Sequence, residues 1–160
     1  MDYHRTHYMD ASVLVKLLVK EEGDEAIINY MKLEYMSTFC ATSLCFAEAL
    51  GAIKSKYLHK EIDQETYFSV GDELRAYFRG SIELSDVDIS DSSIFHEVEV
   101  TAKRYDIDIV DAYQIVTIKK DFSNKFPNSK PILITADKDL AKAARAEGLR
   151  VWNCLTEKAP

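Results

Sequence analysis

The most constraining feature of this sequence is a short apolar run that leads into a helical pattern. Residues 131–135 are apolar almost throughout, as in a strand covered on both faces, and a helical pattern over 140–147 follows Asp137. Residues 8–9 end a similar run, and helical spacing begins after Asp10. Strands that alternate with helices predict a mostly parallel sheet covered by helices.

The rest of the chain continues this alternation. We expect strands that end near Met9 and at 36–42, 82–87, 131–135 and 149–152, and helices at about 11–18, 24–35, 44–57, 63–78, 91–105, 111–120 and 140–147. These elements predict a three-layer α/β/α fold. We expect one domain over 1–160, with a polar N-terminal tail over 1–7 and a polar loop over 121–131.

The ends and faces of two helices can also be predicted. Asp24 is a candidate N-cap for the second helix, and Leu33 falls on its apolar face. Ser43 is a candidate N-cap for the third helix, and Leu50 falls on the side expected to be buried.

Bulk composition bears on the compartment. The cysteines, Cys40, Cys45 and Cys154, are odd in number and form no CxxC pair, which indicates a reducing environment instead of a disulfide framework. No apolar run has the length of a signal peptide core or a membrane span, so we expect a cytoplasmic protein without a membrane partner. His4 and His7 have no further ligand spaced to complete a zinc site, so we expect tail or strand-surface residues.

Four acidic residues lie where the predicted fold would bring them together. Asp10 and Asp137 follow strands directly, Glu48 lies one turn into the helix after the second strand, and Asp111 begins a helix. Strand-to-helix turns converge at the carboxyl ends of parallel strands, where open sheets bind ligands. The sequence therefore predicts one cluster of four carboxylates.

Such a cluster needs a counter-charge, because carboxylates a few ångströms apart raise one another's pKa. Oxygen ligands favour Mg²⁺ or Mn²⁺, and metal-assisted phosphodiester hydrolysis requires no Ser, Cys or His nucleophile. A bound cation would also offset the formal net charge of -7, which by itself disfavours a nucleic-acid partner. Each acid alone can equally be a helix cap or a solvated side chain, and capping or solvation is the favoured interpretation for the neighbours Asp108 and Asp139.

The segments that carry these acids resemble a known family. Together, 8–16, 43–52, 110–112 and 134–140 resemble the PIN-domain ribonucleases, especially VapC-type toxins of type II toxin–antitoxin systems. Each motif is short, but the four occur in the family's order at compatible spacing. The resemblance extends from Tyr8 to the closing segment 148–153.

The resemblance implies a PIN fold, Mg²⁺- or Mn²⁺-dependent endonucleolytic cleavage of RNA, and inhibition by a small antitoxin protein. It maps Asp10, Glu48, Asp111 and Asp137 onto the family's catalytic, metal-binding acids, and Ser12 and Thr135 onto its adjacent hydroxyl positions. Asp108 and Asp139 remain possible auxiliary ligands. Exposed apolar helix faces permit a homodimer, but core packing explains the same residues equally well.

Three other interpretations were compared with this one. A haloacid-dehalogenase-like phosphatase requires a second Asp two residues after the first, where this chain has Ser12. A receiver domain requires a Lys-Pro signal near the last strand, and none is present. The serious alternative is a non-catalytic PIN module that binds RNA or a protein partner, although all four acids are present, so activity has not been lost by deletion of a ligand.

Overall fold

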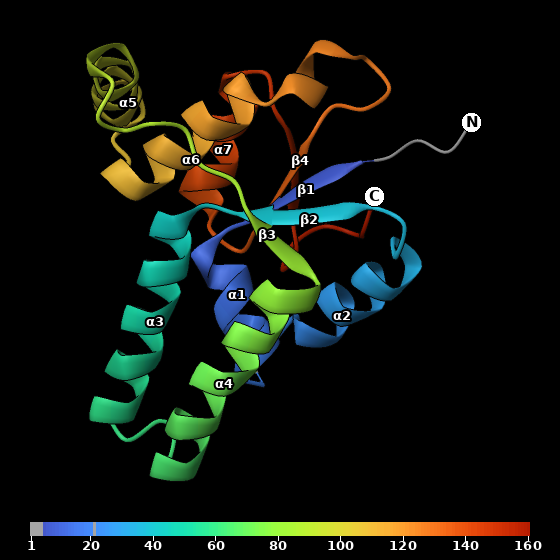
Figure 1. The fold of residues 1–160 in the computed structure, drawn as a ribbon, viewed down its shortest axis with the longest axis vertical. Coiled ribbons are helices and arrows are strands. Elements are labelled where there is room, and N and C mark those ends of the chain that lie inside the picture. Colours follow the sequence, from blue (N-terminus) through green and yellow to red (C-terminus); the bar gives the residue numbers. More distant parts are fainter. Residues whose placement is uncertain (1–4, 21) are drawn as a thin grey trace.

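A computed structural model describes residues 5–20 and 22–160, and its centre is a five-stranded sheet (Figure 1). The strands are β1 (Thr6–Met9), β2 (Thr38–Ala41), β3 (Ile82–Leu84), β4 (Ile132–Thr135) and β5 (Arg150–Asn153), in the order β3-β2-β1-β4-β5. Every pairing is parallel, and Tyr8 of β1 lies opposite both Cys40 and Leu133. The predicted sheet is confirmed, and it is wholly parallel.

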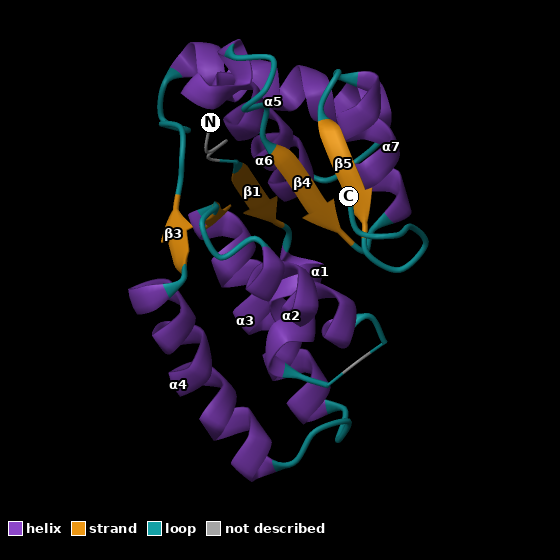
Figure 2. Cartoon of the chain, turned by 90° about the vertical axis from the view of Figure 1, so that its right-hand side faces the viewer, coloured by secondary structure: helices purple, strands orange, loops and turns teal. Residues whose placement is uncertain are grey.

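Helices cover both faces of this sheet. They are α1 (Ala11–Leu18), α2 (Asp24–Leu33), α3 (Ser43–Leu58), α4 (Gln64–Gly80), α5 (Ser92–Tyr105), α6 (Ile109–Lys120) and α7 (Lys138–Ala146), with a short 3₁₀ helix, η1 (Phe122–Lys125), inside the loop predicted as irregular. Helices α1 to α4 lie on one side of the sheet and α5 to α7 on the other, which confirms the three-layer α/β/α class (Figures 1 and 2). None of the described helices is long and apolar enough to cross a membrane.

Alternation along the central strands divides the core between the two faces. Met9 and Ile134 pack into the cluster beneath α1 to α4, whereas Tyr8 and Leu133 pack against α6 and α7. All four side chains are 0–1% exposed. Because β1 and β4 are covered on both faces, nearly every side chain along them must be apolar or have a polar partner.

His7 corrects one prediction. It belongs to β1 and is 0% exposed, not a tail or strand-surface residue, and Thr6 also belongs to the strand. Its ring stacks on Phe39 with centroids 4.8 Å apart, and Nε2 lies 2.9 Å from the Tyr30 hydroxyl. Burial lowers the pKa of His7 to about 4, so the ring is neutral at pH 7. His4 lies outside the described residues.

The start of α2 differs from the prediction. Its N-cap position is Gly23, with φ of 92°, and Asp24 is the first helical residue. A left-handed conformation there suits glycine, which has no Cβ to clash. Leu33, predicted on the apolar face, is the last residue of the helix and is 79% exposed, whereas Ile27 and Tyr30 are its buried residues.

The third helix is also rotated relative to the prediction. Thr42 is its N-cap and accepts a hydrogen bond from the Cys45 amide at 3.1 Å, while Ser43 is already helical. The buried face carries Cys45, Ala49 and Ile53, and Leu50 is 38% exposed. Apolar residues occur all around this helix, so their spacing did not indicate which side faces the core.

Candidate active site

Asp10 lies at the centre of the candidate site, immediately after β1. It caps α1, and its side chain is buried, with the residue 4% exposed. Oδ1 accepts a hydrogen bond from the Ala11 amide at 2.7 Å, and Oδ2 accepts from the hydroxyls of Ser12 at 2.6 Å and Thr135 at 2.9 Å. Burial raises the pKa of this carboxyl group, and the three donors oppose that effect by stabilising the charged form.

The hydroxyls of Ser12 and Thr135 connect Asp10 to the turn after β4. Ser12 Oγ accepts from the Ala136 amide at 3.1 Å, and Thr135 Oγ1 accepts from the Asp137 amide at 2.9 Å. Since each oxygen accepts from a backbone amide, its own proton is directed to Asp10. These two residues therefore fix the carboxylate of Asp10 relative to the turn that carries Asp137.

Asp137 and Asp108 are both N-caps. Asp137 Oδ1 accepts from the amides of Asp139 at 2.7 Å and Leu140 at 2.9 Å at the start of α7. Asp108 Oδ1 accepts from the amide of Asp111 at 2.9 Å at the start of α6. The capping role expected for Asp108 is present, and for Asp137 the cap leaves the second carboxylate oxygen, Oδ2, for another partner.

The negative charges of the other acids shift the pKa of Glu48 and of Asp111. Burial is the largest cause of the raised pKa of Glu48, and the charges of Asp10, Asp108 and Asp137 add to it. Burial, followed by the charges of Asp10, Asp108, Asp137 and Glu48, raises the pKa of Asp111 to about 8. These effects require proximity, so the structure brings the four predicted acids to one region at the carboxyl ends of β1, β2 and β4.

The acids do not, however, form a finished coordination shell. Within residues 5–20 and 22–160, no three Asp, Glu, His or Cys side chains form a group that could hold a metal ion. Mutual repulsion favours side-chain conformations that keep the carboxylates apart, and Glu48 and Asp137 are exposed and able to change conformation. The structure therefore shows a shared acidic region and no metal site as such.

Asp139 is the predicted auxiliary residue with the least connection to this region. Its side chain is exposed in the first turn of α7, and its backbone amide donates to Asp137. The charges that raise the pKa of Glu48 do not include Asp139, although they include Asp108. Of the two auxiliary candidates, only Asp108 is thus placed close to the other acids.

Comparison with known proteins identifies the fold. No family model matches the sequence, and no curated protein matches it. Among solved structures, FitAcB from Neisseria gonorrhoeae shares 17% identity at a TM-score of 0.60, covering 94% of this chain and 99% of its own. PAE2754 from Pyrobaculum aerophilum shares 16% sequence identity at a TM-score of 0.57, and the match covers 92% of this chain and 91% of PAE2754. VapBC2 from Rickettsia felis, bound to a DNA fragment from its promoter, shares 13% sequence identity at a TM-score of 0.56. The match covers 92% of this chain and 97% of the VapBC2 chain. The chain has the fold of these structures, a PIN fold. At these identities the match extends to the architecture alone.

In this PIN fold, the carboxyl edge of the sheet holds one residue that sequence analysis missed. Cys45 is 0% exposed on α3, and the charges of Asp10 and Glu48 help burial to raise the pKa of its thiol to about 12. The thiol is therefore neutral and forms part of the wall beside the acids. A signal existed, because Cys45 precedes Glu48 by three residues and so lies on the same side of the helix.

Proposed function

We propose that this PIN-fold protein is a metal-dependent endoribonuclease that hydrolyses RNA phosphodiester bonds. The observation that supports this most directly is the gathering of carboxylates at one edge of the sheet, where burial and then four surrounding carboxylates raise the pKa of Asp111. A protein gains nothing in stability from such a group of like charges. The arrangement is explained if the acids act together on a cation.

The residues present fit a hard divalent cation. Asp10, Glu48, Asp111 and Asp137 offer only carboxylate oxygens, and among the described residues no Lys or Arg forms an ion pair with any of them. Mg²⁺ and Mn²⁺ prefer such ligands, and Mg²⁺ often takes the rest of its shell from water and substrate phosphate. We therefore assign Mg²⁺ or Mn²⁺ as the cofactor and these four acids as its ligands.

Each residue then has a distinct task. When bound, the cation would activate a water and stabilise negative charge on the phosphate. Asp10 is a rigid ligand, because three internal donors hold its carboxylate. Glu48 and Asp137 are exposed and can adjust to the ion and the RNA. Ser12 and Thr135 position Asp10 instead of touching the substrate, and Asp108 holds Asp111 in place through its amide.

We further propose that the protein is the toxin of a toxin–antitoxin pair and works in the cytoplasm. Support comes from the fold shared with FitAcB and VapBC2 and from the three cysteines, which are buried and form no disulfide with one another. The partners would be RNA as substrate and a small antitoxin protein. A homodimer is also proposed, since Leu58 and Phe68 on the α3–α4 hairpin are 65% and 64% exposed.

The decisive experiment is RNA cleavage by purified protein with Mg²⁺ or Mn²⁺, with and without EDTA. We expect cleavage that EDTA abolishes and that Asp10→Asn reduces on the order of a thousandfold. Asp72→Asn is the matched control, because Asp72 lies on α4 and pairs with Arg75 outside the acidic region. Cleavage that survives both EDTA and Asp10→Asn would refute the mechanism. No cleavage of any RNA by the wild type would favour a non-catalytic PIN module.

A further inference from the structure

The amino ends of the strands carry a cationic cavity at the edge opposite to the acids. Arg5 precedes β1 and Arg150 begins β5, and together with Pro127 and Asn128 they line a cavity of about 310 Å³. Strand β4 lies between β1 and β5, so the two backbones are separated by about 10 Å. Both arginines lower the pKa of the same residue, His7, which places their charges in one neighbourhood. The cavity lining contains no carboxylate.

The arginines of this cavity are not neutralised in the way that other cations are. Arg104, Lys119, Lys120 and Arg145 each form ion pairs with glutamates. Among the described residues, no ion pair involves Arg5 or Arg150. Glu34 also acts on His7, but its carboxylate accepts a hydrogen bond from Ser37 Oγ at 2.8 Å and does not line the cavity. Arg5 and Glu34 have opposite effects on the pKa of Tyr30, so Glu34 lies near Arg5 without forming an ion pair with it.

Exposed aromatic rings occur on the loop that supplies Pro127 and Asn128 to the cavity, and Phe126 directly precedes Pro127. Phe122 and Phe126 are 69% and 49% exposed, with ring centroids 5.2 Å apart, and Lys125 Nζ lies 5.6 Å from the Phe122 centroid. This loop runs on the same side of the molecule as the start of β1 (Figure 1). Large apolar rings gain little from exposure to water unless a ligand covers them.

We propose that Arg5, Arg150, Asn128, Phe122 and Phe126, the amino-edge patch, form a binding site for single-stranded RNA. Guanidinium and amide groups bind phosphates, and flat exposed rings stack with unpaired bases, so the patch offers both halves of single-strand recognition. An acidic peptide would use the arginines but not the rings. The RNA assignment rests on the proposed ribonuclease function.

The position of the patch gives it a role distinct from cleavage. Arg5 and Asp10 are five residues apart on one strand, which corresponds to about 16 Å, so one phosphate cannot contact both. The patch therefore holds RNA several nucleotides away from the bond that is cut. It also places positive charge toward RNA on a protein whose formal net charge is -7.

The test measures binding without cleavage, by fluorescence anisotropy of a labelled, unstructured RNA of about 20 nucleotides with the full chain in EDTA. We compare wild type with Arg5→Gln/Arg150→Gln, with Arg150→Gln alone and with Phe122→Ala/Phe126→Ala. The matched control is Lys54→Gln/Arg79→Gln, which removes two exposed charges elsewhere. Arg150→Gln guards against a folding defect at Arg5, since Arg150 is exposed.

We expect each double patch variant to bind about tenfold more weakly than wild type and the control. The double arginine variant should also reduce the slope of log K against log salt by about 1.4, or about 0.7 per lost contact. Equal affinity of patch and control variants would overturn the inference, as would no RNA binding by wild type. Poly-glutamate competing as well as RNA would overturn it in favour of a protein partner.

These outcomes separate the patch from the proposed enzymatic function. If the wild type cleaves RNA and the patch variants bind RNA normally, the patch is refuted and the ribonuclease stands. If the wild type binds RNA through the patch and never cleaves it, the ribonuclease is refuted and the RNA site stands.

Discussion

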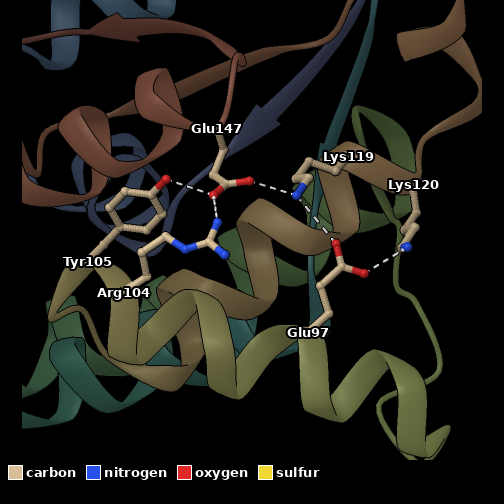
Figure 3. A network of polar contacts seen from close by, with 6 residues as sticks. All are labelled: Glu97, Arg104, Tyr105, Lys119, Lys120 and Glu147. Atoms are coloured by element: carbon tan, nitrogen blue, oxygen red, sulfur yellow. Dashed lines mark hydrogen bonds and ion pairs between the residues drawn. The ribbon is translucent and has the colours of Figure 1, made fainter.

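Carboxylates near the two ends of α7 have pKa values that are shifted in opposite directions. At its start, Asp137 belongs to a group of acids in which the pKa of Asp111 rises to about 8. Just after its end, Glu147 accepts hydrogen bonds from Tyr105 at 2.7 Å, Arg104 at 2.9 Å and Lys119 at 2.7 Å, and its pKa falls to about 2 (Figure 3). The nine residues between them span about 14 Å.

The difference shows which carboxylates serve the fold. Around Glu147, basic side chains from α5 and α6 are close enough to neutralise every acid, and Lys119 and Lys120 also bind Glu97 (Figure 3). The chain therefore has the means to pair buried acids with cations. At the carboxyl edge, no Lys or Arg among the described residues forms an ion pair with the four acids. This is expected if a bound metal ion supplies the positive charge.

The largest effect should come from replacing one repelled acid by its amide. Asp111→Asn should reduce RNA cleavage on the order of a thousandfold. It should also raise the free energy of unfolding in EDTA at pH 8 by about 1–2 kcal/mol, because the wild-type acid is held near four other carboxylates in the folded state only. Urea unfolding measures this change. A variant that is both inactive and less stable than wild type would contradict the comparison.

Removing a hydroxyl beside Asp10 should have the next largest effect. Thr135→Val removes the donor to Asp10 and leaves the Asp137 amide without its acceptor. We expect Mn²⁺ affinity, measured by calorimetry, and cleavage to fall about 10- to 100-fold, and stability to fall by about 1–3 kcal/mol. Thr135→Ser keeps the hydroxyl and should restore the affinity. Equal losses in both variants would mean that the methyl group matters and the hydrogen bond does not.

Much of this site could be predicted from sequence because its positions follow from topology. Asp10 and Asp137 end strands that pair side by side, so their meeting depends only on a parallel sheet. Local patterns also predicted helices that begin near residues 63 and 91, and in the structure Asp63 and Asp91 are the N-caps of α4 and α5. These features need no knowledge of side-chain packing.

Other features depend on contacts that a linear pattern does not contain. The partners of Glu147 lie 42–43 and 28 positions away, and no local signal joins them. The burial of His7 depends on Tyr30 and Phe39, which come from other elements. The directions of the Ser12 and Thr135 hydroxyls follow from amides on the turn after β4, so their positioning role required coordinates.

At the other end of α7, the same acid-to-amide change should act in the opposite direction. Glu147→Gln should lower the free energy of unfolding at pH 7 by about 1–2 kcal/mol, discounted because Arg104 is half exposed. The pKa of Glu147 in the folded state, about 2, lies below the usual pKa of 4.5, so this stabilisation is complete above about pH 4.5 and disappears toward pH 2.

The measurement is urea unfolding of wild type and Glu147→Gln across that range, because the difference between them cancels the titration of other acids. We expect the two curves to separate at pH 7 and converge as pH falls. Cleavage at pH 7 should be unchanged, provided that the variant remains folded. A difference that is constant with pH would assign the effect to packing instead of charge.

The smallest effect on cleavage should come from a substitution of Asp139, the acid just outside the group of predicted ligands. Asp139→Asn changes an exposed acid two residues from Asp137, in the first turn of α7, so we expect a loss of only about 0.3–1 kcal/mol in stability from the helix dipole. Cleavage should change by no more than about twofold. Asp137→Asn, in contrast, should reduce cleavage strongly although its amide oxygen can still cap the helix. If Asp139→Asn proved as damaging as Asp111→Asn, the repelled acids would include five ligands, and the boundary drawn from the charges acting on Glu48 would be wrong.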